Sequence, residues 1–138
     1  MIVLDTNVLV RLATADDPVQ AGEAKTCLVK ARTLGEEVFV PSGAVMECVW
    51  TLAKGYGFSA HDIAEFIERF ADIDGVALEH EECVLAAARA YALRGDFPDL
   101  LFLELAKEKE ATCLVTFDRT LQALSEGFAV APAAYAGL

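Results

Sequence analysis

The feature that most constrains the fold is a carboxylate at the junction between the first predicted strand and the first predicted helix. Residues 2–4 form a short apolar run that is typical of a buried strand. Asp5 stands where that strand ends, and residues 8–12 begin a helix. In an open α/β sheet, ligands bind where a strand ends and a helix begins. The pattern therefore predicts a functional group at this edge of a sheet.

Strands and helices are predicted to alternate along the rest of the chain. Alternation indicates right-handed crossovers and a mostly parallel sheet with helices on both faces. We expect one domain over residues 1–138, a three-layer α/β/α fold with a central parallel sheet of about four to five strands and about seven helices. Beyond the first pair of elements, strands are predicted at 38–40, 76–78, 112–117 and 127–130, and helices at 19–33, 43–54, 81–93, 98–109 and 119–126, with one more after Ser59.

The composition agrees with one compact domain. A chain of 138 residues that is 55% hydrophobic can bury a sizeable core. The apolar runs are too short to span a bilayer, and the N-terminus lacks the pattern of a signal peptide. We therefore expect a cytoplasmic protein that has no membrane partner.

The net charge of −11 argues against a generic nucleic-acid binder. Such proteins are basic, because neutralising phosphates supplies their affinity. The charge has a different meaning if several of the acids hold cations, since bound cations reverse the local field.

The cysteines predict no metal site. Cys27, Cys48, Cys83 and Cys113 are widely spaced and match no zinc pattern. Their apolar neighbourhoods predict small core residues in a reducing compartment.

Four acids are candidates for a functional site, but only their combination indicates one. Singly, each has a structural explanation: Asp5 and Asp118 can cap helices, Asp99 can belong to a capping box with Asp96, and Glu47 can lie on a solvated helix face.

Together, the four acids are predicted to converge at one edge of the sheet. Asp5 and Asp118 both follow buried strands, and Asp99 opens a helix whose N-terminus belongs at the same edge. Glu47 is a single acid in an otherwise apolar helical turn. Four converging carboxylates repel unless a cation lies among them, and Mg²⁺ and Mn²⁺ prefer such oxygen ligands.

The motifs around these acids resemble those of the PIN-domain ribonucleases, most closely the VapC-type toxins of prokaryotic toxin–antitoxin pairs. The resemblance covers nearly the whole chain, in the order and spacing of that family. It rests on four segments: Asp5-Thr6-Asn7-Val8-Leu9-Val10-Arg11, Glu47 with Trp50, Asp96-Phe97-Pro98-Asp99-Leu100-Leu101, and Thr116-Phe117-Asp118.

The resemblance implies a Mg²⁺- or Mn²⁺-dependent endoribonuclease that uses Asp5, Glu47, Asp99 and Asp118 as metal-binding and catalytic acids. A metal-activated water would cleave RNA phosphodiester bonds. The resemblance also implies a parallel sheet with the first strand at its centre, a homodimer, and a VapB-type antitoxin whose C-terminal tail covers the acidic groove.

Residues beside the four acids are expected to support them. Thr116 points to the same side of its strand end as Asp118, so its hydroxyl is a candidate to bind water or phosphate. Thr6 and Asn7 are expected to brace the Asp5 loop through local hydrogen bonds. Asp96 is expected first to cap a helix and second to lie beside the metal.

Two arginines are candidates to contact RNA. Arg11 and Arg119 lie near the proposed site in the sequence, as does Lys54. Ordinary solvated surface cations are an equally good interpretation for each.

Two rival functions remain. A phosphotransfer domain also places an Asp at the end of its first strand, but a haloacid-dehalogenase-like phosphatase needs a second acid two residues later, where this chain has Asn7. A receiver domain needs an acidic pair at the first strand and a lysine that ends a late strand, and neither is present. The stronger rival is a non-catalytic PIN-like domain that binds nucleic acid or a partner protein.

Overall fold

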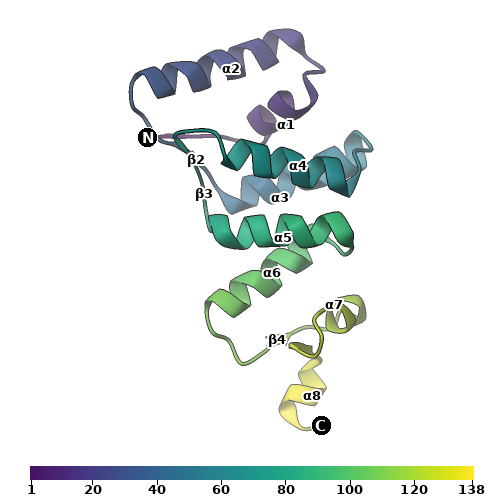
Figure 1. The fold of residues 1–138 in the computed structure, drawn as a ribbon. Coiled ribbons are helices and arrows are strands. Elements are labelled where there is room, and N and C mark those ends of the chain that lie inside the picture. Colours follow the sequence, from purple (N-terminus) through teal and green to yellow (C-terminus); the bar gives the residue numbers. More distant parts are fainter.

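The structure is a computed structural model that describes residues 1–138. Figure 1 shows the helices and strands in chain order. The helices are α1 (Thr6–Thr14), α2 (Pro18–Thr33), α3 (Ser42–Trp50), α4 (Ala60–Ala71), α5 (Glu81–Leu93), α6 (Phe97–Glu108), α7 (Arg119–Leu124) and α8 (Pro132–Ala136), and a π-helical turn η1 (Thr51–Gly55) extends α3. The strands are β1 (Ile2–Val3), β2 (Val38–Val40), β3 (Val76–Leu78), β4 (Leu114–Val115) and β5 (Ala129–Val130).

The predicted α/β class with parallel strands is confirmed. Strands β1, β2 and β3 form one parallel sheet in that order, with Ile2 opposite Val38 and Val38 opposite Val76. Strands β4 and β5 form a second parallel sheet, with Leu114 opposite Ala129. The strands are therefore divided between two sheets, whereas the sequence predicted a single one.

The position of β1 also differs from the expectation. The resemblance implied that the first strand is central, but β2 is the central strand of the three and β1 is an edge strand. Figure 1 shows the reason: β4 lies at the opposite end of the molecule from β1, next to α7 and beyond α6. Strand β1 therefore has a neighbour on only one side.

The core is built around β2 and the helices that cover the first sheet. Val38 and Val40 of β2 are buried, and α4 packs on β3 and on α5, which in turn packs on α6. One cluster contains nearly all of the buried apolar residues, including Leu121 of α7 and Ala129 of β5. The largest side chains with no exposure are Phe97, Leu52, Ile63, Leu101, Val40 and Val84.

Side chains at the start of α2 and α4 cap these helices. Asp17 accepts a hydrogen bond from the backbone N–H of Gln20 and caps α2, and Ser59 caps α4 through Asp62. Ser42 does not cap α3, because it lies one residue inside the helix. The cap comes instead from Glu79, at the end of β3, whose carboxylate accepts hydrogen bonds from the Ser42 N–H at 3.0 Å and hydroxyl at 2.8 Å.

Other differences from the sequence expectations are local. Helix α8 was not predicted, and β4 is shorter than the predicted 112–117, since only Leu114 and Val115 pair with β5. Cys48 and Cys83 are buried as expected, but Cys27 is exposed on α2. No helix combines the length and the apolar character that crossing a membrane requires.

Candidate active site

Asp5 and Glu47 form the first group of predicted site residues. Asp5 follows β1 and caps α1, accepting a hydrogen bond from the Thr6 N–H at 2.7 Å. The Thr6 hydroxyl donates a hydrogen bond of 3.0 Å to the carboxylate of Glu47 on α3. Both acids line an open hollow of about 340 Å³ between β1, α1 and α3. Thr6 thus links two distant segments, where the sequence suggested only a local brace.

Asp99 is the centre of a second group. It lies in the first turn of α6 and is partly buried. Burial raises its pKa, and the negative charges of Asp96 and Asp118 raise it further. Asp118 caps α7 by accepting a hydrogen bond from the Leu121 N–H at 3.0 Å. The structure therefore brings three acids from two helix N-termini within electrostatic reach of one another.

Asp96 occupies the cap position of α6, but its side chain makes no capping hydrogen bond. The preferred expectation, that this side chain caps the helix, is therefore wrong. The Asp96 carboxylate is exposed and contributes negative charge to the surroundings of Asp99. A role beside the metal stays a prediction.

The two groups lie on neighbouring elements but do not merge. Helix α3, which carries Glu47, packs against α6, which carries Asp99. No three of the predicted acids place their carboxylate oxygens within 4.8 Å of one another. The structure thus unites Asp5 with Glu47, and Asp99 with Asp96 and Asp118, without bringing the four main acids to one point.

The donor chemistry of both groups fits a divalent cation. None of the five acids forms an ion pair with a lysine, an arginine or a histidine. Three carboxylates that repel one another and have no cationic partner provide the hard oxygen ligands that Mg²⁺ and Mn²⁺ prefer. Burial is the main reason that the pKa of Asp99 is raised, and a cation would offset the repulsion by Asp96 and Asp118 that raises it further.

The supporting residues have varied surroundings. The Thr116 hydroxyl accepts a hydrogen bond from the Asp118 N–H at 3.0 Å, and the Gln122 side chain donates one of 2.8 Å to the Thr116 carbonyl. Thr116 therefore shapes the loop that presents Asp118. Asn7 is exposed beside β1 and makes no side-chain hydrogen bond.

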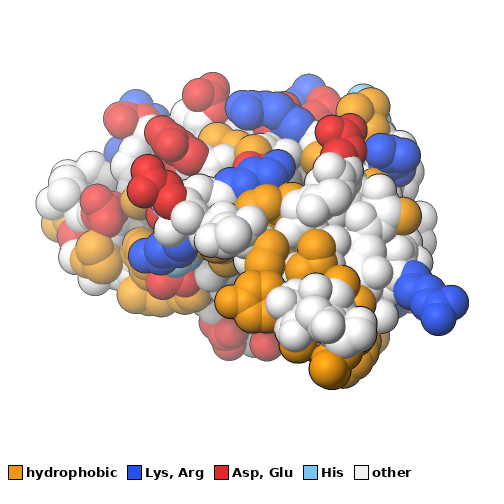
Figure 2. Space-filling view, turned by 90° about the horizontal axis from the view of Figure 1, so that it is seen from below, with side chains coloured by type: hydrophobic (Ala, Val, Ile, Leu, Met, Phe, Trp, Pro, Cys, Tyr) orange, Lys and Arg blue, Asp and Glu red, His pale blue; other side chains and the backbone are white.

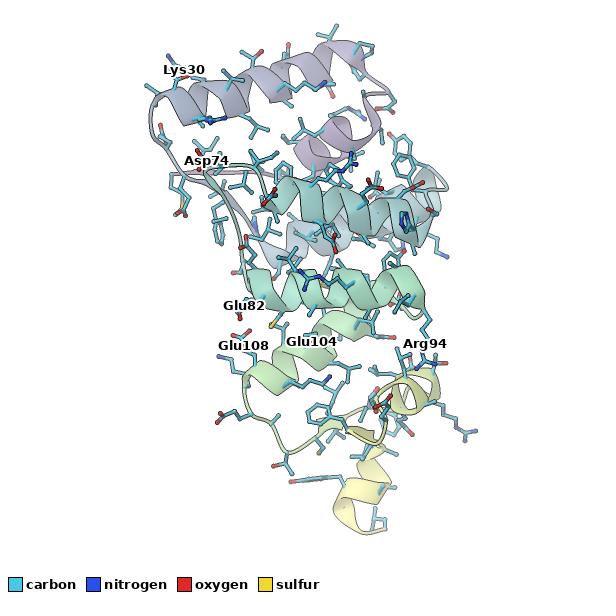
Figure 3. The ribbon with its side chains drawn as sticks, in the orientation of Figure 1. Lys30, Asp74, Glu82, Arg94, Glu104 and Glu108 are labelled. Atoms are coloured by element: carbon cyan, nitrogen blue, oxygen red, sulfur yellow. The ribbon has the colours of Figure 1, made fainter.

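The candidate arginines differ in whether their guanidinium groups already have hydrogen-bonding partners. The Arg11 guanidinium donates hydrogen bonds to Gln20 at 2.7 Å and to Asp16 at 3.0 Å, so it joins α1 to the start of α2. Arg119 is exposed and unpaired at the start of α7. Arg94, which directly follows α5, lies beside α7 in Figure 3 and also forms no ion pair. Its position beside α7, which the sequence did not show, makes Arg94 a further candidate to contact RNA.

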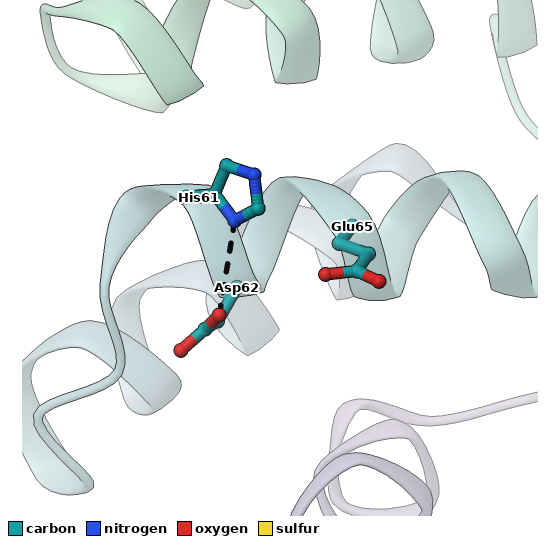
Figure 4. A group of neighbouring side chains, drawn as sticks. All are labelled: His61, Asp62 and Glu65. Carbon is teal, nitrogen blue, oxygen red and sulfur yellow. Dashed lines mark ion pairs between the residues drawn. The ribbon is translucent and has the colours of Figure 1, made fainter.

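Two other acidic groups lie outside the proposed site. His61, Asp62 and Glu65 place ligand atoms within 4.8 Å of one another on the exposed face of α4 (Figure 4). Glu65 is already paired with Arg69, and Asp62 lies in the first helical turn, where a negative charge is stabilised. This group is explained as a solvated helix face.

The second group surrounds Cys83 between α5 and α6. Glu108 accepts a hydrogen bond from the Cys83 thiol, and Figure 3 shows Glu82, Glu104 and Glu108 at this end of the two helices. Burial and these carboxylates raise the pKa of Cys83 to about 11. The thiol is therefore protonated at neutral pH, as expected of a structural cysteine.

Comparisons with known proteins identify the family. The chain is 27% identical over 125 residues to a protein named VapC ribonuclease from Aquifex aeolicus (strain VF5), covering 90% of this chain and 92% of that protein. No solved structure matches the chain. The model of the PIN domain family matches residues 2–127, so the chain belongs to the PIN domain family.

Proposed function

We propose that this protein is a Mg²⁺- or Mn²⁺-dependent endoribonuclease that hydrolyses RNA phosphodiester bonds. The observation that carries the proposal is the group of neighbouring carboxylates of Asp96, Asp99 and Asp118, none of which forms an ion pair. Burial raises the pKa of Asp99, and the charges of its two neighbours raise it further. Membership of the PIN family and the similarity to a VapC ribonuclease support the same activity.

Each acid has a proposed role. Asp99 and Asp118 hold the metal from two helix N-termini, whose partial positive charge favours ionised carboxylates. Asp5 completes the metal site, and Glu47, oriented by the Thr6 hydroxyl, orients the attacking water. When bound, the metal supplies a water of lowered pKa and stabilises charge on the scissile phosphate. Thr116 and Asp96 support this site from its rim.

RNA contacts are proposed for the free cations near these acids. Arg119 follows Asp118 in the chain, and Arg94 lies two residues before Asp96. Both arginines are exposed and form no ion pair, so they are available to bind phosphates. Arg11 is a weaker candidate, because Asp16 and Gln20 already hold its guanidinium.

The biological setting follows from the similarity to VapC. We infer a toxin of a type II toxin–antitoxin pair, acting in the cytoplasm, with a VapB-type antitoxin as its inhibitor and a homodimer as its functional form. With a net charge of −11, strong binding to bulk RNA is not expected, which favours a narrow and structured RNA target.

One observation favours the alternative function, a non-catalytic PIN-like binding domain. The acids lie in two groups, and no three of them share one ligand-binding point. A domain that only binds a partner has no need to unite them. The cleavage experiment below separates the two functions.

The test is cleavage of total cellular RNA by the purified protein, freed of any antitoxin. The reactions contain Mg²⁺, Mn²⁺ or EDTA and compare the wild type with Asp5→Asn and with Asp72→Asn, an exposed acid outside the site. We expect discrete fragments with either metal, none with EDTA, and a loss of at least about a hundredfold in Asp5→Asn only. Equal cleavage by Asp5→Asn and the wild type would exclude the proposed site.

A further inference from the structure

We propose that a Zn²⁺ ion binds between the start of α5 and the end of α6. The ligand side chains are His80, Cys83, Glu104 and Glu108. Asp99 lies in the first turn of α6 and Glu108 is the last residue of that helix, so the zinc site is distinct from the proposed active site. The inference does not rest on the proposed function. The ion would fasten together the two ends of a helical hairpin.

The four side chains come as two closely spaced pairs. His80 is the cap residue of α5 and Cys83 follows three residues later, while Glu104 and Glu108 are four residues apart in α6. Side chains three or four residues apart are neighbours on a helix surface. Only residues 94–96 separate α5 from α6, and the two helices pack against each other. Figure 3 accordingly shows Glu104 and Glu108 beside the start of α5.

The Glu108 carboxylate lies between the thiol and the imidazole. One of its oxygens accepts a hydrogen bond of 2.6 Å from the Cys83 thiol, and the other lies 3.8 Å from His80 Nδ1. Tetrahedral Zn²⁺, with bonds of about 2.0 to 2.3 Å, holds its donor atoms about 3 to 4 Å apart. The three donor atoms do not all lie within 4.8 Å of one another, so binding requires a side-chain rotation. The His80 and Glu108 side chains are 39% and 45% exposed, which leaves both free to rotate.

Cys83 differs from a cysteine that only fills the core. Cys48 is such a residue: it is buried, and burial alone raises its pKa. Cys83 is only 6% exposed, but the negative charges of Glu108, Glu104 and Glu82 also act on its thiol. A buried thiol that points at carboxylates, with an imidazole beside them, has the surroundings of a metal ligand.

The donor set favours Zn²⁺ over the hard cations proposed for Asp99 and its neighbours. Sulfur and imidazole nitrogen suit Zn²⁺, whereas Mg²⁺ prefers oxygen ligands. On binding, the S–H bond of Cys83 breaks, its proton passes to the solvent, and a sulfur–zinc bond forms. The charge of the ion also offsets the repulsion among the carboxylates around the thiol. The spacing of the cysteines could not predict this site, because only one of its ligands is a cysteine.

The proposed zinc site is accessible from the solvent. Seen from below, charged side chains cover the left part of the molecule (Figure 2), the side on which the start of α5 and the end of α6 lie in Figure 1. One cation competes with the metal, since Lys107 Nζ lies 3.6 Å from the Glu104 carboxylate. The Lys107 side chain is largely exposed, and an ion pair of this kind contributes little. Zn²⁺ can therefore replace it.

Binding of Co²⁺, a spectroscopic substitute for Zn²⁺, tests the site through its thiolate. The purified protein is titrated with Co²⁺ in excess Mg²⁺ and a non-thiol reductant. We expect the visible bands of tetrahedral cobalt and a near-ultraviolet band from charge transfer between thiolate and cobalt. Cys83→Ser should lose the charge-transfer band, and Cys27→Ser, at an exposed cysteine of α2, should keep it. A wild type without this band, or a band that Cys83→Ser keeps, overturns the inference.

Thermal unfolding tests the two exposed ligands, whose replacement leaves the core intact. In the same Mg²⁺ buffer, Zn²⁺ should raise the midpoint temperature of the wild type by several degrees, because it binds the folded state. His80→Ala and Glu108→Gln should lose most of this shift, since each removes a ligand and weakens binding at least about tenfold. The matched control, His61→Ala, removes an exposed histidine of α4 and should keep the shift. No shift in the wild type, or equal shifts in all four proteins, overturns the inference.

Asp118→Asn distinguishes the zinc site from the proposed active site. This variant changes an acid that caps α7 and should keep the charge-transfer band of the wild type. Loss of the band in Asp118→Asn would mean that the cobalt depends on the active-site acids, and it overturns the inference. Neither measurement uses RNA, so a protein that binds Zn²⁺ but does not cleave RNA refutes the proposed function alone.

Discussion

Asp99 is the residue whose surroundings most require a cation. It is partly buried, and Asp96 and Asp118 both place negative charge near it. Its pKa is raised because the ionised form loses hydration and meets like charges. In the metal-free protein, ionisation of the Asp99 carboxyl group is therefore less favourable in the folded state than in the unfolded chain.

Replacing Asp99 should stabilise the metal-free protein at neutral pH. Because the pKa of Asp99 is raised in the folded state, its ionised carboxylate lowers the free energy of unfolding at pH values above that pKa. Below about pH 4 the carboxyl group is protonated in both the folded and the unfolded state, so this destabilisation is absent. Asp99→Asn should therefore raise the midpoint temperature of unfolding in EDTA at pH 7 by a few degrees. The gain should disappear on acidification.

The matched control for this prediction is Asp72→Asn, which changes an exposed and unpaired acid at the end of α4. Its unfolding temperature should stay at the wild-type value. Adding Mn²⁺ should stabilise the wild type more than Asp99→Asn. An unchanged or lower midpoint for metal-free Asp99→Asn at pH 7 would mean that Asp99 is not under electrostatic stress.

Single residues were predictable where the cause is local. The sequence showed that Asp5 and Asp118 end strands and can cap helices, and both do so. It did not show the hydrogen bond between Thr6 and Glu47, which joins segments 41 residues apart. It also misjudged Asp96, because a residue at a cap position can still turn its side chain elsewhere.

The elements follow the same rule. Periodicity and capping residues predicted α5 at its observed bounds, Glu81–Leu93, and predicted strands β2 and β3 as well. The π-helical turn η1 was missed because no local signal distinguishes it from the end of an α-helix. Helix α8 was missed because no local signal distinguishes it from an irregular C-terminal tail. Strand β4 was predicted too long, since the length of a strand depends on its partner.

Helix α3 depends on a cap that comes from another element. The Glu79 carboxylate accepts two hydrogen bonds from Ser42, and these bonds lower its pKa. Its contribution to stability is therefore present above the ordinary pKa of Glu and is lost as the pH falls through the lowered value. This cap fixes the start of the helix that carries Glu47.

Glu79→Gln should lower the free energy of unfolding by about 1 kcal/mol at pH 7, because it removes a charged cap. The difference from the wild type should shrink as the pH falls below about 4. Urea unfolding at pH 7 and below pH 4 measures this difference, with Glu37→Gln as a control at an exposed acid that forms no ion pair. Equal losses for both variants would refute the capping role.

At the scale of the whole molecule, the fold class was predictable and the arrangement of the sheets was not. Alternating strands and helices indicate a parallel α/β domain, as observed. Whether β4 joins β1 depends on contacts between distant surfaces, which periodicity does not encode. The division of the acids into two groups follows directly from the division of the strands.

The account's central claim is that these acids bind a divalent cation, and titration with Mn²⁺ tests it most directly. Electron paramagnetic resonance counts the free ion during titration of the wild type, Asp99→Asn, Asp118→Asn and Asp72→Asn. We predict saturable binding by the wild type and Asp72→Asn, and an affinity at least about tenfold weaker in the other two. The same affinity in all four proteins, or no binding by any, would contradict the claim.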